Sequence, residues 1–180
     1  MNSKATNKAI FLDRDGVINV DKQYVSKIED FEFKEGIFEL LHYFQNLGYL
    51  LIVITNQSGI GRGYYTLEDF QNLTAWKLSR LEDEGIKIHE VYYCPHSPES
   101  NCSCRKPSPE MLLRAKEKYN IDMKKSWMIG DKRTDILAGK KAGVGWTVLI
   151  TSAHRVIENC KADFLVNDVR KLKELIKGEG

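Results

Sequence analysis

The sequence predicts an α/β fold, a three-layer, doubly wound and mostly parallel sheet with helices on both faces. Two patterns predict it. Short, continuous apolar runs, which are typical of buried parallel strands, alternate with segments whose apolar residues recur at helical spacing. Polar residues directly follow several of these runs, and ligands of such sheets bind at the carboxyl ends of the strands.

Six apolar runs predict the strands, and their flanking residues predict the helices. The strands are expected at 9–12, 50–54, 88–93, 127–129, 146–150 and 164–166. A first helical pattern spans 37–47, with Gly48 as its C-terminal cap.

The starts of the later helices also have sequence signals. Thr66 and Asp69 form a capping-box pattern, and Ser108 is expected as an N-cap with Pro109 as the first helical residue. Another helix is expected to begin near Thr134. A helix, the short strand and a final helix are expected within 151–177.

Length and composition limit the classes of protein. The 180 residues suit a single domain, residues 1–180, with its core at about 8–150. The net charge of +2 is too balanced for a nucleic-acid-binding face, and no apolar run is long enough to span a membrane. The polar segment 1–8 lacks the apolar stretch of a secretory signal, so we expect a cytoplasmic protein, and a monomer.

Four polar motifs follow or flank the predicted strands. Asp13 and Asp15 of the first motif can supply a nucleophile, a proton donor and ligands for a hard cation. Thr55 begins a turn that can hold phosphoryl oxygens, Lys106 precedes a helix, and Asp131 offers a further carboxylate. Each motif alone also fits a solvated turn, a basic pair or a helix cap. Their shared position at strand ends predicts one phosphate-binding crevice.

The order and wording of these motifs resemble the haloacid-dehalogenase superfamily of phosphatases, whose members form an aspartyl-phosphate intermediate. The resemblance implies a Mg²⁺-dependent phosphoric monoester hydrolase with Asp13 as nucleophile and Asp15 as general acid and base. Thr55 and Lys106 would neutralise phosphoryl oxygens. Asp13, the backbone carbonyl of Asp15, and Asp131 would bind Mg²⁺, whereas Asp135 would orient its neighbours. A phosphate-binding protein without turnover remains a remote alternative.

A second cluster lies in the segment 94–104. Cys94, His96, Cys102 and Cys104 provide three thiols and one imidazole within eleven residues, which matches a closed structural zinc site. The alternative is a loop of free, reduced thiols. Cys160, far from the cluster, is expected to be a small buried residue.

The segments 11–16, 18–21, 24–25, 31–33, 55–60 and 104–107 resemble one branch of the superfamily. That branch hydrolyses D-glycero-D-manno-heptose 1,7-bisphosphate at the 7-phosphate, in the biosynthesis of the ADP-heptose precursor of lipopolysaccharide. That resemblance implies a sugar bisphosphate substrate. The short loop from His96 to Cys102 resembles histidinol-phosphate phosphatases of histidine biosynthesis, which is the alternative. Arg62 adds a cation in favour of the bisphosphate.

No interval between motifs is long enough for a separate cap domain, so loops 19–30 and 57–65 and the zinc loop 94–104 should cover the crevice. By the same resemblance, the substrate would contact residues of these loops and of the strand ends, namely Asp21, Lys22, Gln23, Tyr24, Thr55, Asn56, Gln57, Ser58, Arg105, Lys106 and Lys132.

Overall fold

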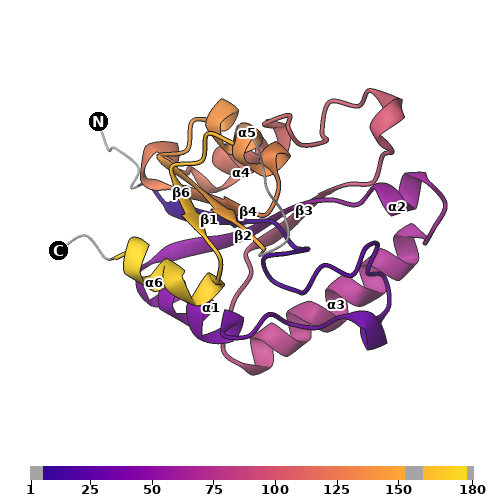
Figure 1. Ribbon diagram of the computed structural model, residues 1–180, viewed down its shortest axis with the longest axis horizontal. Helices are drawn as coiled ribbons and strands as arrows, with labels where there is room; N and C mark the ends of the chain where they lie inside the picture. The colour runs from indigo at the N-terminus through magenta and orange to yellow at the C-terminus, as the bar shows by residue number, and fades with distance from the viewer. Residues whose placement is uncertain (1–5, 153–159, 178–180) are drawn as a thin grey trace.

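The centre of the molecule is a six-stranded sheet in which every pairing is parallel (Figure 1). The computed structural model describes residues 6–152 and 160–177. The strands lie in the order β3-β2-β1-β4-β5-β6. Their bounds are β1 Lys8–Leu12, β2 Tyr49–Asn56, β3 Glu90–Cys94, β4 Trp127–Gly130, β5 Trp146–Ile150 and β6 Phe164–Val166. The predicted fold class and all six predicted strands are confirmed.

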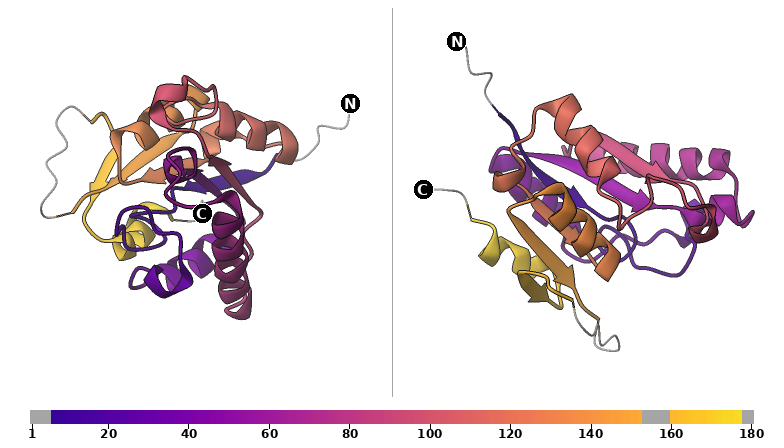
Figure 2. Two further views of the ribbon diagram at one scale, coloured as in Figure 1. Left: turned by 90° about the vertical axis from the view of Figure 1, so that its right-hand side faces the viewer. Right: turned by 90° about the horizontal axis from the view of Figure 1, so that it is seen from above.

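Helices cover both faces of this sheet, as the views in Figures 1 and 2 show. One face carries α1 (Ile37–Asn46), α3 (Leu67–Asp83) and α6 (Leu172–Leu175), and the other carries α4 (Glu110–Tyr119) and α5 (Arg133–Ala142). A single turn, α2 (Ser58–Gly61), follows β2. The described part of the chain has no helix long and apolar enough to cross a membrane.

The alternation of side chains along each strand builds two cores. On β1, Ile10 and Leu12 pack with the α1 and α3 side, whereas Ala9 and Phe11 pack with the α4 and α5 side. All four are fully buried. Burial of one such large apolar side chain contributes roughly 1.5–3 kcal/mol. The central strands are therefore held from both faces, which fixes the positions of the residues that follow them.

The helix caps agree with the sequence at two places and differ at a third. The Thr66 hydroxyl accepts from the Asp69 backbone N–H at 3.1 Å, and the Asp69 carboxylate accepts from the Thr66 N–H at 2.8 Å, so the predicted capping box is confirmed. Gly48 follows α1 with φ +83°. However, α4 begins at Glu110 with Pro109 as its cap, one residue later than expected. The Ser108 hydroxyl still accepts from the Glu110 N–H at 3.3 Å.

The C-terminal segment holds β6 at one edge of the sheet, then a 3₁₀ turn at Val169–Lys171 and the short α6. The helix predicted between Thr151 and the strand at 164–166 falls mainly on 153–159, which lie outside the described residues. Cys160 is partly exposed rather than buried, because it lies in the connection that leads to an edge strand.

Candidate active site and thiol cluster

The polar residues predicted at the strand ends meet at one edge of the sheet. Asp13 directly follows β1, and Asp131 directly follows β4, the strand beside it. Lys106 reaches the same place from the loop before α4, and its Nζ lies 2.9 Å from Asp13 Oδ1. We call Asp13, Lys106, Asp131 and Asp135 the strand-tip cluster. Its members are at most 8% exposed.

The ammonium of Lys106 is fixed from three directions. Besides Asp13, it pairs with Asp135 Oδ1 at 2.7 Å and donates to the Ile54 carbonyl at 2.7 Å. Burial alone would lower the pKa of Lys106, but the two carboxylates outweigh burial and raise the pKa above its usual value. Lys106 therefore stays charged beside the candidate nucleophile.

Three carboxylates crowd around this single ammonium. Oxygen atoms of Asp13, Asp131 and Asp135 all lie within 4.8 Å of one another. Burial first, and then the charge of Asp135, raise the pKa of Asp13 well above its usual value, although Lys106 opposes the rise. Burial and Asp135 likewise raise the pKa of Asp131 to about 6. Three carboxylates and one ammonium sum to two negative charges, so this donor set suits a divalent cation with a preference for oxygen.

Asp135 differs from the other two carboxylates because both its oxygens are already bound within the protein. Oδ1 pairs with Lys106, and Oδ2 accepts the backbone N–H groups of Asp131 and Lys132 at 3.1 and 3.0 Å. It thereby ties the start of α5 to the end of β4. This arrangement suits the orienting role that the resemblance implies for Asp135.

Asp15 is held beside the cluster by donors that favour its ionised form. Arg14, which is fully buried, donates to both carboxylate oxygens at 2.9 and 3.1 Å. Asn19 and Gln57 donate at 3.0 and 3.2 Å. Burial opposes ionisation, but Arg14 and the other donors outweigh it and lower the pKa of Asp15.

Gln57 links the first two motifs to each other. Its Nε2 donates to Thr55 Oγ1 at 2.8 Å as well as to Asp15, and its Oε1 accepts from the Tyr65 hydroxyl at 2.5 Å. Burial raises the pKa of Tyr65 to about 12, so the hydroxyl remains a donor. The ring of Tyr65 packs against Gly59, where an added Cβ would lie 2.1 Å from a ring carbon.

Two further contacts fix the backbone around the cluster. The Asn56 amide donates to the Lys106 carbonyl at 3.1 Å and accepts from the Lys106 N–H at 3.0 Å, which joins β2 to the loop before α4. At Gly16, φ is +88° and an added Cβ would lie 2.2 Å from Asp131 Oδ2. Only glycine allows the loop after β1 to approach Asp131 this closely.

A cavity of about 440 Å³ opens above the cluster. Tyr24 of the loop 19–30 lines it, and the ring of Tyr24 meets the ring of Tyr64, from the loop 57–65, edge to face with centroids 4.8 Å apart. Two of the three predicted loops, 19–30 and 57–65, line the cavity, whereas the lining includes no residue of the predicted zinc loop 94–104 and begins only at Arg105, directly after it. The lining consists of Asp13, Asp15, Asp21, Gln23, Tyr24, Asn56, Gln57, Ser58, Arg62, Tyr65, Arg105, Lys106, Lys132, Thr134 and Asp135.

Three of the residues predicted for catalysis, substrate binding or Mg²⁺ binding do not line this cavity. Thr55 is fully buried beneath it, and Asp131 lines a neighbouring hollow with Gly16. Lys22 pairs with Glu32 at 2.9 Å, and the structure does not bring it into the cavity.

Sequence reasoning missed the residues that hold Asp15. Arg14 stands inside the first motif, but nothing in its position predicts that its guanidinium turns inward onto the next residue. Tyr65 lies eight residues after Gln57, and only the fold of the intervening turn brings the two together. Asn19 could have been suspected from its place in the loop after the first motif.

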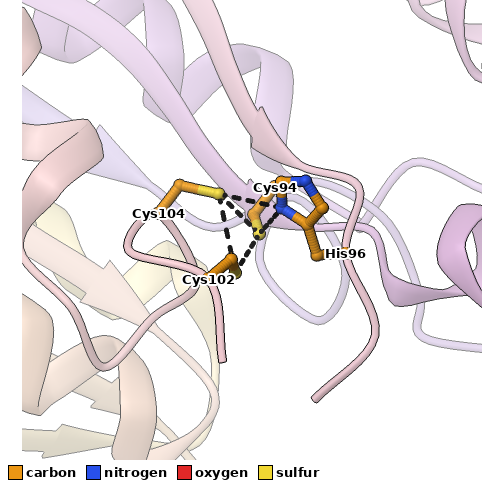
Figure 3. A group of neighbouring side chains, drawn as sticks. All are labelled: Cys94, His96, Cys102 and Cys104. Carbon is orange, nitrogen blue, oxygen red and sulfur yellow. Dashed lines mark hydrogen bonds between the residues drawn. The ribbon is translucent and has the colours of Figure 1, made fainter. Parts of the chain in front are cut away.

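The second predicted cluster also comes together. We call Cys94, His96, Cys102 and Cys104 the thiol cluster, and Figure 3 shows their sulfur atoms and the imidazole pointing toward one another. The sulfur atoms lie 2.9–3.8 Å apart, and His96 Nδ1 lies 3.3 Å from Cys104 Sγ and 3.5 Å from Cys94 Sγ. All three cysteines are free of disulfides.

Comparison with known proteins finds a hydrolase family and phosphatases that are similar to this chain. A model of the HAD-hydrolase-like family matches residues 103–172. A D-glycero-beta-D-manno-heptose-1,7-bisphosphate 7-phosphatase from Helicobacter pylori is 54% identical over 81% of this chain and 84% of its own length. A phosphatase from Campylobacter jejuni, named for the alpha anomer of the same bisphosphate, is 48% identical over 94% of both chains.

A solved structure is similar over almost the whole chain. The crystal structure of D,D-heptose 1,7-bisphosphate phosphatase from B. bronchiseptica, complexed with magnesium and phosphate, has a TM-score of 0.82 at 26% identity. The similarity covers 93% of this chain and 97% of that one.

Proposed function

The chain belongs to the family of haloacid-dehalogenase-like phosphatases that includes the heptose-1,7-bisphosphate 7-phosphatases, and on that premise we propose that it removes the 7-phosphate from D-glycero-D-manno-heptose 1,7-bisphosphate. One observation carries the choice of substrate. The cavity above the nucleophile is lined by three cations besides Lys106, namely Arg62, Arg105 and Lys132. A substrate with two phosphates matches this charge better than one with a single phosphate.

The charge of the cavity argues against the histidinol-phosphate alternative. An amine-bearing substrate needs a carboxylate near its amine, and beyond the strand-tip cluster and Asp15, Asp21 is the one carboxylate among the described lining residues. Lys132 lies 3.9 Å from Asp21 and offsets its charge. The short loop from His96 to Cys102 is the observation that keeps this alternative in the test.

In the proposed first step, a carboxylate oxygen of Asp13 attacks phosphorus and the bond from phosphorus to the leaving oxygen breaks. Lys106, held at 2.9 Å, opposes the effect of burial and favours the ionised form of Asp13. Lys106 and the Thr55 hydroxyl stabilise the charge on the phosphoryl oxygens. The products of this step are the aspartyl phosphate and the free sugar hydroxyl.

Asp15 moves the protons in both steps. It gives a proton to the leaving oxygen and later takes one from the water that attacks the aspartyl phosphate, releasing inorganic phosphate. The donors around Asp15 favour the ionised form, which suits the second step. For the first step, the approaching phosphate dianion raises the pKa of Asp15 by like-charge repulsion and allows it to carry a proton.

Mg²⁺ fits the oxygen donors and the charge of the strand-tip cluster. Asp13, Asp131 and the backbone carbonyl of Asp15 would hold it, while Asp135 stays bound to Lys106. When bound, Mg²⁺ supplies positive charge to the phosphoryl group. Zn²⁺ fits the thiol cluster, because a tetrahedral site with Zn–S bonds of about 2.3 Å places its ligands roughly 3.8 Å apart. Four protein ligands leave no open position, so the proposed zinc is structural. A cytoplasmic monomer stays a prediction.

Phosphate release from heptose 1,7-bisphosphate, as each anomer, and from histidinol phosphate tests the substrate. We expect the highest kcat/KM for one anomer of the bisphosphate, with retention of the anomeric phosphate. A higher kcat/KM for histidinol phosphate would overturn the proposed substrate but not the phosphatase activity.

A further inference from the structure

Arg62 lines the cavity and pairs with Glu99, and neither side chain takes part in the two chemical steps described above. We propose that Arg62 is a specificity-determining residue that binds the phosphate retained on the product, and that Glu99 is the internal anion which this phosphate displaces. The inference rests on the proposed function, because it concerns the second phosphate of the same substrate.

The backbone that carries Arg62 is fixed against the loop of the thiol cluster. The N–H of Gly61 donates to the Pro95 carbonyl at 2.8 Å, and the N–H of Arg62 donates to the Ser58 carbonyl at 2.9 Å. A Cβ added at Gly61 would lie 2.6 Å from the Ser97 backbone nitrogen. The turn α2 therefore abuts the loop directly, and Arg62 projects from a rigid position into the cavity lining.

Arg105 supplies the second half of the proposed subsite. It follows Cys104 directly, so the thiol cluster fixes its backbone too. Its Nη1 is buried and has no hydrogen-bond partner among the described residues. Arg105 and Arg62 line the same cavity. A buried guanidinium nitrogen without an acceptor favours the binding of an anion, and phosphate is the acceptor that guanidinium groups bind in a bidentate manner.

The carboxylate of Glu99 is affected by the positive charges of both Arg62 and Arg105. Arg62 Nη2 lies 3.8 Å from Glu99 Oε1, and the Glu99 side chain is 73% exposed. The pKa of Glu99 is lowered, first by its own backbone N–H and by Ser97, and then by the charges of Arg62 and Arg105.

An exposed pair at 3.8 Å contributes little to stability, so Glu99 is poorly suited to be a structural support. It is well suited to be exchanged. A phosphate dianion carries more charge than a carboxylate and binds guanidinium more strongly, so it takes Arg62 from Glu99. Because the Arg62–Glu99 ion pair must break, its free energy is subtracted from the binding of the bisphosphate. Arg62 has an anionic partner both in the free enzyme, where it is Glu99, and in the complex, where it is the phosphate.

The test compares kcat/KM for heptose 1,7-bisphosphate with kcat/KM for heptose 7-phosphate, which lacks the retained phosphate. We expect Arg62→Gln to lower this ratio about tenfold, through a higher KM for the bisphosphate, because a hydrogen bond to a charged group is lost. Glu99→Gln should lower the KM for the bisphosphate about twofold to threefold, since the competing anion is removed. Arg62→Lys should restore part of the ratio.

Arg80→Gln is the matched control, because it removes the same charge from the exposed last turn of α3. The control should keep the wild-type ratio. Two results would overturn the inference and leave the proposed function standing. One is a wild-type preference for the bisphosphate that Arg62→Gln keeps, and the other is a higher KM for the bisphosphate in Glu99→Gln. A wild-type enzyme without preference for the bisphosphate would overturn both, because no retained phosphate would then need a binding site.

Discussion

The two clusters of metal-ligand residues are built in opposite ways. Asp13 and Lys106 of the strand-tip cluster are 93 residues apart in sequence and meet only because the sheet has formed. The four members of the thiol cluster lie within eleven residues, in a loop with little apolar core of its own. The first cluster is therefore a product of the fold, and the second is a means of holding a loop. Loss of the first should affect chemistry, whereas loss of the second should affect structure.

The largest expected effect comes from the strand-tip cluster. Asp13→Asn should lower kcat by roughly a thousandfold or more, because the nucleophile is lost. The free energy of unfolding should stay equal or rise, since burial already disfavours the charged form of Asp13. Phosphate release and thermal unfolding together measure this. Asp83→Asn, at the exposed end of α3, is the control, and a fall in stability of Asp13→Asn without loss of turnover would reverse the comparison.

The thiol cluster should give the opposite pattern. Cys102→Ser should reduce bound zinc and lower stability by about 2 kcal/mol, which is roughly 4–8 °C in Tm for a chain of this size. Cys160→Ser removes a thiol outside the cluster and should change neither. Metal analysis of the purified protein and thermal unfolding make the measurement. Zinc-free wild-type protein with an unchanged Tm would remove the proposed structural role.

Two buried lysines sharpen the comparison within the catalytic half. Lys106 has three partners, whereas Lys77 on α3 is fully buried and its Nζ has no hydrogen-bond partner among the described residues. Burial, with a further contribution from Arg14, lowers the pKa of Lys77 to about 7. Lys77→Met should therefore raise the free energy of unfolding by about 2 kcal/mol at pH 7.

The pH dependence of this gain has a definite sign. The pKa of Lys77 is lower in the folded protein than its usual value of 10.5, so the penalty is fully present below pH 7 and disappears as the pH rises toward 10.5. The gain from Lys77→Met should shrink in the same window. Lys116→Met, on the exposed face of α4, is the control. A gain that is constant from pH 7 to 10 would contradict an uncompensated charge.

The smallest expected effect concerns the affinity for Mg²⁺. Because the pKa of Asp131 is raised to about 6 from its usual 3.8, protons compete with the cation below pH 6. The Mg²⁺ dissociation constant, measured by calorimetry, should rise by up to about tenfold per pH unit as the pH falls from 6 to 5. Zinc content should not change over this range, and an unchanged Mg²⁺ affinity would argue against Asp131 as a ligand.

The sequence predicted those parts of the site that depend on chain order. Strand ends point to one edge of a parallel sheet, so Asp13, Thr55 and Asp131 could be placed together before any side chain was seen, whereas the resemblance to the family implied the role of Lys106. The thiol cluster was predictable because its members are close in sequence.

The remaining contacts depend on side-chain directions, which strand and helix patterns do not contain. The inward turn of Arg14 onto Asp15 and the link from Tyr65 to Gln57 are of this kind. Lys22 lies in the loop 19–30, as the prediction of a substrate contact required, but its side chain pairs with Glu32 and does not line the cavity. The start of α4 moved by one residue because Pro109 adopts the cap rather than the first helical position.

The order of the strands determines which parts of the sheet should open locally most often. β1 and β4 each have a neighbour on both sides, whereas β3, which ends at Cys94, lies at an outer edge. Edge strands open more readily than central ones, so amide hydrogens of β1 should exchange with solvent last. Asp13 is therefore attached to the strand that should open most slowly. The loop 94–104, which abuts Arg62 and Arg105, follows the edge strand β3, which should open sooner. We therefore expect that substitutions in the loop after β3 can alter which ester is bound while Asp13, at the end of β1, keeps its position.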